Sequence, residues 1–245
     1  MILAIDCGNT RVKWGLRGLH DQPAAPGEPG PWRAQGARPV AEIAHLHTDW
    51  ASIAAPTRIA IANVAGEGAR AALEQALARF APEPHWLTAA PSQCGVTNSY
   101  ASPAQLGADR WAALIGAWHL RQGASLVVNA GTATTVDMLG ADGLFRGGLI
   151  LPGVDLMKRS LADHTSGLPL SGGAYAEEPR STADAIESGC LHAQLGAIER
   201  IYARLDPGAV CFLSGGAAHR IAPLLGMSLR VVDNLALEGL VRVAA

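Results

Sequence analysis

Residues 3–10 read Leu-Ala-Ile-Asp-Cys-Gly-Asn-Thr, and residues 126–133 read Leu-Val-Val-Asn-Ala-Gly-Thr-Ala. In each copy an apolar run of strand type ends at an Asp or Asn, and a small residue, a glycine and a hydroxyl or amide side chain follow. Asn129 comes 123 residues after Asp6, about half the length of this 245-residue chain. A pattern repeated at that distance predicts two similar lobes.

Each copy is expected to open a β-hairpin, with returning strands at 11–16 and 133–139. We expect the glycine to permit an otherwise strained turn whose consecutive N–H groups hold a phosphate, while Asn9, Thr10 and Thr132 add donors. Two such hairpins could grip one triphosphate from opposite lobes. The alternative is a pair of ordinary turns, since Gly and Asn are common in hairpins. The chain has no Walker or Rossmann glycine motif.

The remaining periodicity predicts an α/β chain. Strands are expected at 58–64, 85–88, 125–130, 209–213 and 229–233, and helices at 67–80, 110–121, 154–162, 182–205 and 217–225. Ser181, with Asp184 three residues later, predicts the cap of the long helix. The Pro- and Gly-rich segment 21–39 is expected to be a surface loop.

The composition excludes several classes of protein. With 49% hydrophobic and 16% charged residues the chain can form a sizeable core, and its net charge of −2 argues against nucleic acid or an anionic membrane as a partner. No apolar run is long enough to cross a bilayer, and no basic leader precedes the first strand, so we expect a cytoplasmic protein. The four scattered cysteines and the eight histidines form no metal-binding motif.

Four separated stretches carry a family resemblance. They are Asp6-x-Gly8-Asn9-Thr10, Asn98-x-Tyr100-x-x-Pro103-x-x-Leu106-Gly107-Ala108-Asp109-Arg110-Trp111, Gly131-Thr132-Ala133-Thr134-Thr135 and Gly147-Gly148-x-Ile150-x-Pro152-Gly153. In order and spacing the chain resembles type III pantothenate kinases, a branch of the actin-like, sugar-kinase-like ATPases. The resemblance implies an α/β fold of two ribonuclease-H-like lobes, each a mixed sheet with flanking helices. We place them at 1–115 and 116–245, with one phosphate hairpin in each.

The resemblance also implies an activity. A relative of this family would transfer the γ-phosphate of ATP, with Mg²⁺, to the primary hydroxyl of pantothenate, giving phosphopantothenate for coenzyme A biosynthesis. It would be a cytoplasmic homodimer whose pantothenate pocket is completed near the subunit interface. Two alternatives stay open: a kinase for another small hydroxyl substrate, and a non-catalytic accessory or regulatory protein on the same fold.

The resemblance assigns the catalytic base to Asp109, in the motif Gly107-Ala108-Asp109-Arg110. From the residue alone, Asp109 could equally cap a helix that begins near Arg110. Arg110 would bind the pantothenate carboxylate or a transferring phosphate oxygen, or else form a surface ion pair. The expected substrate-binding residues are Tyr100, Gly107, Ala108, Asp109, Arg110 and Thr182. Tyr100 could instead be a core aromatic, and Thr182 only a helix cap.

On the nucleotide side, the expected ATP-binding residues are Asp6, Cys7, Gly8, Asn9, Thr10, Arg11, Val12, Lys13, Gly131 and Thr132. Asp6 is expected to hold Mg²⁺ through water, because Mg²⁺ is usually bound by one or two carboxylates together with substrate phosphates. Asn129 departs from the family, which usually carries an aspartate there to bind a monovalent cation. An amide keeps the oxygen and loses the charge, which leaves open whether the chain uses K⁺ or NH4⁺.

Overall fold

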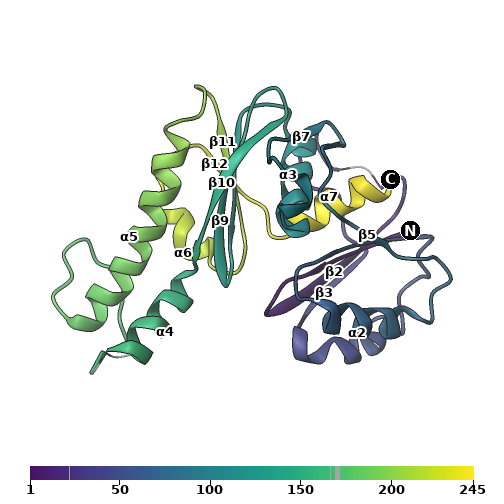
Figure 1. The fold of residues 1–245 in the computed structure, drawn as a ribbon, viewed down its shortest axis with the longest axis horizontal. Coiled ribbons are helices and arrows are strands. Elements are labelled where there is room, and N and C mark those ends of the chain that lie inside the picture. Colours follow the sequence, from purple (N-terminus) through teal and green to yellow (C-terminus); the bar gives the residue numbers. More distant parts are fainter. Residues whose placement is uncertain (22, 166, 169–171) are drawn as a thin grey trace. The chain divides into compact units, whose positions relative to one another are not determined.

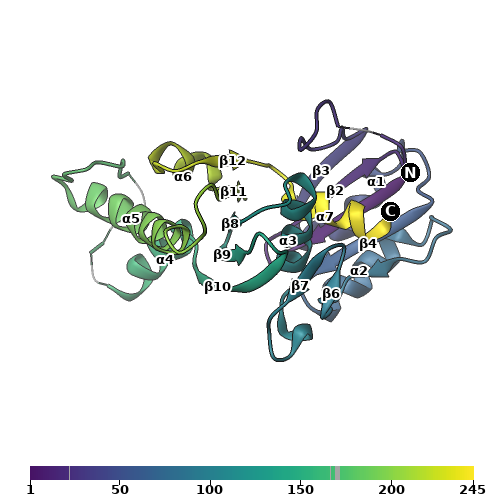
Figure 2. The ribbon, with the colours of Figure 1, turned by 90° about the horizontal axis from the view of Figure 1, so that it is seen from above.

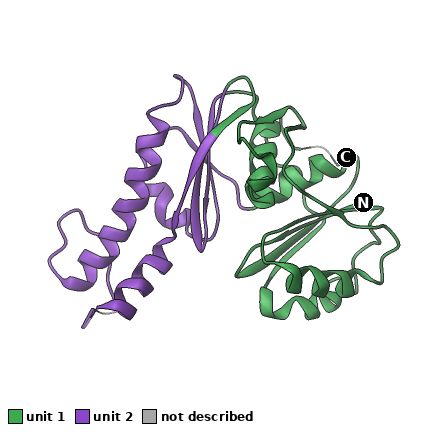
Figure 3. Cartoon of the chain, in the orientation of Figure 1, with its two compact units in different colours: residues 1–123, 141–146, 234–245 green, residues 124–140, 147–233 purple. Residues whose placement is uncertain are grey.

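The structure, a computed structural model, describes residues 1–21, 23–165, 167–168 and 172–245. The chain forms two compact units (Figure 3): unit 1 contains residues 1–123, 141–146 and 234–245, and unit 2 contains residues 124–140 and 147–233. The predicted boundary after residue 115 falls inside helix α3 (Ala108–Leu120). The compact units therefore do not coincide with the predicted lobes, because the end of the chain packs with unit 1.

Unit 1 is built on a five-stranded mixed sheet in the order β3-β2-β1-β4-β5. Its strands are β1 (Ile2–Cys7), β2 (Arg11–Arg17), β3 (Ala34–Pro39), β4 (Arg58–Asn63) and β5 (His85–Trp86). β1 pairs antiparallel with β2, with Cys7 opposite Val12, and parallel with β4. This confirms the first predicted hairpin.

One segment of unit 1 differs from the prediction. Residues 34–39 form β3, although the whole segment 21–39 was expected to be a loop. β3 pairs antiparallel with the outer edge of β2, where Trp14 lies opposite Gly36. A side chain at Gly36 would collide with the Trp14 ring, 2.8 Å from its Nε1. The glycine that suggested a loop therefore permits a strand over a buried tryptophan.

Helices complete unit 1. α2 (Glu67–Leu77) and the short segment formed by the 3₁₀ helix η1 (Val40–His45) and α1 (Leu46–Asp49) pack on the sheet, and their buried residues Ile43, Leu46 and Leu73 join the core of β1 and β2. The region between Pro91 and Pro103, expected to be irregular, contains two short strands, β6 (Ser92–Gln93) and β7 (Val96–Asn98). A second 3₁₀ helix, η2 (Pro103–Gln105), leads into α3.

The last helix, α7 (Leu235–Ala244), lies beside α3 in both views (Figures 1 and 2) and packs against it and β1. The sequence-based assignment ended at the last strand and missed α7. The two helix backbones approach closely, because a Cβ at Gly239 would lie 1.8 Å from the Ala112 carbonyl oxygen. Only glycine fits at such a crossing, so α7 fixes the position of α3, which carries the Asp109-Arg110 motif.

A buried ion pair fastens α7 to the sheet. Arg17 of β2 donates from Nη1 and Nη2 to the two carboxylate oxygens of Glu238, at 2.7 and 2.6 Å. Both side chains are less than 5% exposed, and Arg17 also donates to the Gly30 carbonyl and lies over the Trp32 ring. A buried pair of this kind contributes little net stability when complete, but loss of one partner costs about 3–5 kcal/mol.

Unit 2 contains a mixed sheet in the order β12-β11-β8-β9-β10. Its strands are β8 (Ser125–Ala130), β9 (Ala133–Leu139), β10 (Leu144–Pro152), β11 (Val210–Ser214) and β12 (Leu229–Val231); the first residues of β10 belong to unit 1. β8 and β9 pair antiparallel with Ala130 opposite Thr134, which confirms the second predicted hairpin. β8 also pairs parallel with β11.

The helices of unit 2 are α4 (Val154–His164), α5 (Thr182–Tyr202), α6 (Ala218–Ile221) and the 3₁₀ helix η3 (Ala222–Leu224). α4 and α5 lie against one another (Figure 1). The predicted cap is confirmed, since Ser181 accepts a hydrogen bond from the Asp184 N–H at 3.1 Å. Among the described residues, no helix combines the length and hydropathy that a membrane crossing needs.

Candidate functional site

The turn of the first hairpin exposes Asn9, Thr10 and Arg11 and buries Cys7 and Val12. The Gly8 N–H donates to the Arg11 carbonyl at 3.0 Å and closes the turn. The side chains of the exposed residues therefore face solvent, whereas buried Cys7 and Val12 can offer a ligand only backbone groups. Burial raises the pKa of the Cys7 thiol to about 11, with a smaller contribution from Asp6, so the thiol stays protonated.

The expected strain at the two turn glycines is wrong. Neither Gly8 nor Gly131 has a positive φ. A Cβ at Gly8 would come no closer than 3.6 Å to the Arg11 oxygen, and one at Gly131 no closer than 3.5 Å to the Ala133 oxygen. These turns are unstrained, so glycine is not required by the backbone conformation, and its effect is to leave the space over the turn free of a side chain.

Asp6 lies at the end of β1 with Lys13 directly opposite it on β2. Its Oδ1 atom is buried and has no hydrogen-bond partner in the structure. Burial, followed by the negative charge of Asp109, raises the pKa of Asp6 to about 7, and Lys13 opposes this shift. The ionised form of this carboxyl group is therefore poorly stabilised by its surroundings, which is typical of a carboxyl group that binds a cation or a proton.

Asp109 is the second residue of α3, which begins at Ala108 with Gly107 as its N-cap. The helix thus starts earlier than expected, and Asp109 is not the cap residue itself. Its Oδ1 accepts the Arg110 N–H at 2.8 Å. Burial raises the pKa of Asp109, although this N–H and the charge of Arg110 partly oppose the shift. A carboxylate with a raised pKa is a better proton acceptor than an ordinary one.

Gly107 has a steric role beside this carboxylate. A Cβ at Gly107 would lie 2.7 Å from Oδ1 of Asp109 and 3.8 Å from Val64, which follows β4. Val64 is tied to the first hairpin because its N–H donates to the Cys7 carbonyl at 2.9 Å. The motif glycine therefore leaves room for the Asp109 carboxylate, whose charge acts on Asp6 near the end of β1.

Arg110 is buried beside the rings of Tyr100 and Phe145 and does not lie on the surface. It is 6% exposed, and its Nη1 donates to the Tyr100 hydroxyl at 3.4 Å. Its guanidinium carbon lies 5.8 Å from the centre of the Phe145 ring, and the Tyr100 and Phe145 rings are 5.2 Å apart. The structure thus brings together Arg110 and Tyr100, two of the predicted substrate-binding residues. The sequence analysis missed Phe145.

Asn98 holds Tyr100 in this arrangement. It is 8% exposed, its Oδ1 accepts the Tyr100 N–H at 3.0 Å, and its Nδ2 donates to the Pro103 carbonyl at 3.2 Å. Such an Asx turn rigidifies an irregular segment. The spacing Asn98-x-Tyr100-x-x-Pro103 therefore has a physical reason, since one amide side chain satisfies the backbone on both sides of the tyrosine.

The second hairpin lies in unit 2, with Gly131 and Thr132 exposed at its turn. Gly153 packs directly against this turn. Its N–H donates to the Thr132 carbonyl at 2.9 Å, and a Cβ at Gly153 would lie 2.1 Å from the Gly131 oxygen. Asn129 is half-buried and lies between Thr135 of β9 and Ser214 of β11 in the sheet. The Gly131 N–H donates to the Ala133 carbonyl at 3.1 Å and closes the turn, as the Gly8 N–H does in the first hairpin.

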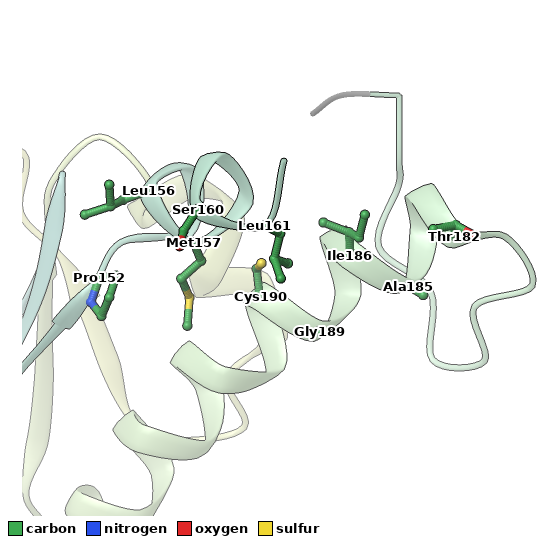
Figure 4. A pocket seen from close by; sticks show the side chains of 10 residues that line it. All are labelled: Pro152, Leu156, Met157, Ser160, Leu161, Thr182, Ala185, Ile186, Gly189 and Cys190. Atoms are coloured by element: carbon green, nitrogen blue, oxygen red, sulfur yellow. The ribbon is translucent and has the colours of Figure 1, made fainter. Parts of the chain in front are cut away.

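Thr182 begins α5 at the edge of an apolar pocket in unit 2 (Figure 4). The pocket has a volume of about 730 Å³ and lies between α4 and α5. Its lining residues are Pro152, Leu156, Met157, Ser160, Leu161, Thr182, Ala185, Ile186, Gly189 and Cys190. Thr182 is exposed, and Ser181 is the residue that caps the helix, so the reading of Thr182 as a cap is wrong.

The geometry of unit 1 suits a phosphotransfer to an alcohol. It combines a partly buried carboxylate as proton acceptor, an open turn with donors, and a cation held against aromatic rings. Within the described residues, no group of three or more His, Cys, Asp or Glu side chains could hold a metal ion by itself. A metal ion there would therefore need ligands from the substrate or from water as well as Asp6.

Comparison with known proteins agrees with this chemistry. The sequence profile of the family described as type III pantothenate kinase matches residues 2–204. A type III pantothenate kinase of Aromatoleum aromaticum is 52% identical over 247 aligned residues, which cover 100% of this chain and 98% of the relative.

Solved structures show the same fold at low identity. A Baf family protein from Campylobacter jejuni has a TM-score of 0.64 at 19% identity and covers 97% of this chain and 94% of its own. The activator of the 2-hydroxyisocaproyl-CoA dehydratase from Clostridium difficile, solved with bound ADPNP, has a TM-score of 0.54 at 11% identity, covering 99% and 92%. These likenesses concern the fold alone, and they confirm the predicted α/β class. The sequence matches, to the family profile over residues 2–204 and to the 52% identical relative over the whole chain, show that this chain belongs to the type III pantothenate kinase family.

Proposed function

We propose that this chain transfers the γ-phosphate of ATP to the primary hydroxyl of pantothenate, the first step of coenzyme A biosynthesis. The family membership carries the reaction. The observation that carries the mechanism is the raised pKa of Asp109, a carboxylate at the start of α3 that is only partly exposed. A kinase for another hydroxyl substrate and a non-catalytic accessory protein are both less well supported, since the relative is named for pantothenate and Asp6, Asp109 and Arg110 are all present.

Asp109 is the proposed general base. Its carboxylate accepts the proton of the pantothenate hydroxyl as the oxygen forms its bond to the γ-phosphorus. The bond from the γ-phosphorus to the β–γ bridging oxygen breaks in the same displacement, and ADP leaves with that oxygen. Burial removes much of the hydration that would stabilise the ionised carboxylate, and this raises its affinity for a proton.

The first hairpin is the proposed ATP-phosphate site. Exposed Asn9, Thr10 and Arg11 offer side-chain donors, and the open space over Gly8 lets an anion approach the backbone. Lys13, opposite Asp6, adds positive charge. Gly131 and Thr132 of the second hairpin are proposed to bind phosphate by the same means, since that turn is likewise exposed and unstrained.

Asp6 fits the Mg²⁺ that accompanies ATP. Its buried Oδ1 lacks a hydrogen-bond partner and its pKa is raised to about 7, so a nearby cation would stabilise the ionised form. A carboxylate oxygen is the ligand type that Mg²⁺ prefers. When bound, the ion supplies positive charge to the phosphate oxygens. Asp6 would hold it directly or through water.

Arg110 and Tyr100 are proposed to bind pantothenate. Arg110 is buried and held at Tyr100 and Phe145, so its charge has already lost most of its water and can bind a carboxylate strongly. The family resemblance implies that Gly107 and Ala108 also bind pantothenate. Their place beside Asp109 would bring the hydroxyl to the base.

The enzyme is also proposed to be a cytoplasmic homodimer, as the resemblance implies. Apolar side chains on β10 and α4 of unit 2 are unusually exposed, with Ile150 at 66% and Leu149 at 40%. Leu156 and Leu161, which line the pocket between α4 and α5, are each 37% exposed. A second copy of the chain would cover this apolar surface, and Thr182 would then lie near the interface.

A direct assay tests the reaction. Purified protein is given ATP, Mg²⁺ and pantothenate, and ADP release is followed with and without pantothenate. Pantothenate-dependent ADP release with formation of phosphopantothenate is expected. ADP release that is independent of pantothenate, or none in folded protein that binds ATP, would refute the proposal and favour another substrate or an accessory role.

A further inference from the structure

Phe145 contacts two of the proposed pantothenate-binding residues of unit 1, Arg110 and Tyr100. It is fully buried, with its ring centre 5.8 Å from the guanidinium carbon of Arg110 and 5.2 Å from the ring centre of Tyr100. The first distance is within the range of about 6 Å over which a cation is attracted to an aromatic ring. The Tyr100 and Phe145 rings are tilted by 51°, and the distance between their centres lies within the range of about 4.5–7 Å typical of interacting aromatic pairs.

Three segments meet at this ring, and the one that carries Phe145 follows the other two by 35 residues or more (145 minus 110). Arg110 comes from the first turn of α3, and Tyr100 from the irregular segment that follows β7. Phe145 comes from the beginning of β10, where it is paired in parallel register with Asn98. Asn98 in turn accepts the Tyr100 N–H. The strand pairing therefore couples the position of Phe145 to that of the tyrosine through one residue.

The ring also acts on the charge of Arg110. A guanidinium that is 6% exposed has lost most of its hydration, and the negative face of an aromatic ring replaces part of it. Contact with the ring restricts the movement of the guanidinium, and a fixed orientation is needed for a two-bond contact with a carboxylate. An aliphatic side chain at position 145 would fill the space but would supply neither effect.

We propose that Phe145 is a positioning residue for pantothenate, which holds Arg110 and Tyr100 in the geometry that recognises the carboxylate of the substrate. The proposal rests on the proposed function, because it names the substrate that these two residues bind. It predicts a selective defect: loss of the ring weakens recognition of the carboxylate end of pantothenate and leaves the handling of ATP unchanged.

Two ligands separate this role from a structural one. Pantothenate and pantothenol share the reacting hydroxyl, but in pantothenol an alcohol replaces the carboxylate. Their dissociation constants are measured by calorimetry with a non-hydrolysable ATP analogue present, and the KM for ATP is measured in parallel. The variants are Phe145→Met, which nearly keeps the volume, and Phe145→Leu as a second substitution should the first not fold.

The chain supplies a matched control. Phe212 of β11 is also fully buried, and Arg230 lies over its ring at 5.5 Å, but it lies in unit 2. Phe212→Met removes an equivalent arginine–ring contact and a similar amount of core packing. Any general effect of core destabilisation should therefore occur in both variants.

For Phe145→Met we expect pantothenate to bind roughly tenfold more weakly, while pantothenol binding and the KM for ATP change by about twofold or less. Phe212→Met should leave the ratio of the two dissociation constants unchanged. Equal weakening of both ligands, or an equal rise in the KM for ATP, would overturn the proposal and leave Phe145 a core residue. Should the unmodified protein fail to phosphorylate pantothenate at all, the proposed function itself would be refuted, and this inference with it.

Discussion

Asp6 and Asp109 are electrostatically coupled carboxyls: after burial, the negative charge of Asp109 is the largest contribution that raises the pKa of Asp6 to about 7. The two groups lie on different elements, β1 and α3, and Gly107 leaves the room that the Asp109 carboxylate occupies. Two neighbouring carboxyls with raised pKa values are costly for folding and useful for binding a cation and a proton. This relationship gives the first prediction.

Asp6→Asn should stabilise the ligand-free protein and abolish its activity. The folded-state pKa of Asp6, about 7, lies above its ordinary value of 3.8, so the unfolded chain loses this proton first as the pH rises. The ionised group therefore lowers the free energy of unfolding progressively between those values, and the cost is complete above about pH 7. At pH 8 we expect a gain on the order of 2 kcal/mol, after allowance for the part of Asp6 that water reaches.

Thermal unfolding measures this effect. A gain of that size should raise Tm by about 4–8 °C at pH 8 and by much less near pH 4. Asp163→Asn, at an exposed position of α4, provides the control and should change Tm little at either pH. An Asp6→Asn protein that is no more stable at pH 8 than at pH 4, relative to the unmodified chain, would show that the carboxyl is not under electrostatic stress.

Gly153→Ala should weaken ATP binding. The new Cβ would lie 2.1 Å from the Gly131 oxygen and 2.8 Å from the Thr132 oxygen, so the second hairpin turn would have to move. We expect the KM for ATP to rise roughly tenfold or more, with a smaller change in the KM for pantothenate. Gly196→Ala, on α5 with nothing within 4 Å of the new Cβ, is the matched control and should keep both values. Unchanged kinetics in Gly153→Ala would argue against a phosphate role for this turn.

Asn129→Asp should make the enzyme responsive to potassium. The amide at this position keeps an oxygen but carries no charge, so the unmodified chain is expected to work equally well with Na⁺ or K⁺ as the salt. A carboxylate adds the charge that attracts a monovalent cation. Activity measured across a potassium titration should rise in the variant and stay flat in the parent. Strong potassium activation of the unmodified chain would contradict this, and would mean that other oxygens suffice.

Ile150→Glu should break the proposed homodimer. The Ile150 side chain is 66% exposed in the isolated chain, and a carboxylate placed in an apolar interface would be buried without a partner. Sedimentation of the unmodified protein is expected to give a dimer, and the variant a monomer with reduced pantothenate-dependent activity. Leu19→Glu, an exposed apolar position in unit 1 at 40%, serves as the control. A monomeric parent would refute the proposed dimer.

Local patterns predicted most of the elements that build this fold. Both hairpins, the strand at 58–63 and the capped helix α5 follow from apolar runs, turn residues and a Ser–Asp spacing that act over a few positions. β3 and α7 were missed because their formation depends on remote partners. β3 pairs with the edge of β2 over the Trp14 ring, and α7 packs against α3 and β1. Asn234 at the start of α7 is a residue type that favours a helix start, and the sequence analysis did not use it.

The candidate site was predictable to a similar degree. The family resemblance carried by their motif assigned Asp109, Arg110 and Tyr100 to the site, and the structure brings Arg110 and Tyr100 into contact. Phe145 could not be found in this way, because strand pairing between β10 and β7 brings it to Asn98 from 47 positions away in the chain (145 minus 98). The nearest motif in the sequence is Gly147-Gly148, two residues after Phe145, and a pair of glycines does not predict that a neighbouring side chain contacts an arginine or a tyrosine.

The proposed base offers the most direct test of the account. ADP release with ATP, Mg²⁺ and saturating pantothenate is compared between the unmodified protein and Asp109→Asn, which keeps the side-chain size and can still accept the Arg110 N–H. Loss of general-base catalysis should lower kcat by about 10²–10⁴-fold, while pantothenate and ATP bind with little change. An Asp109→Asn protein that retains kcat within about threefold of the parent would contradict the central claim that Asp109 accepts the proton of the substrate hydroxyl.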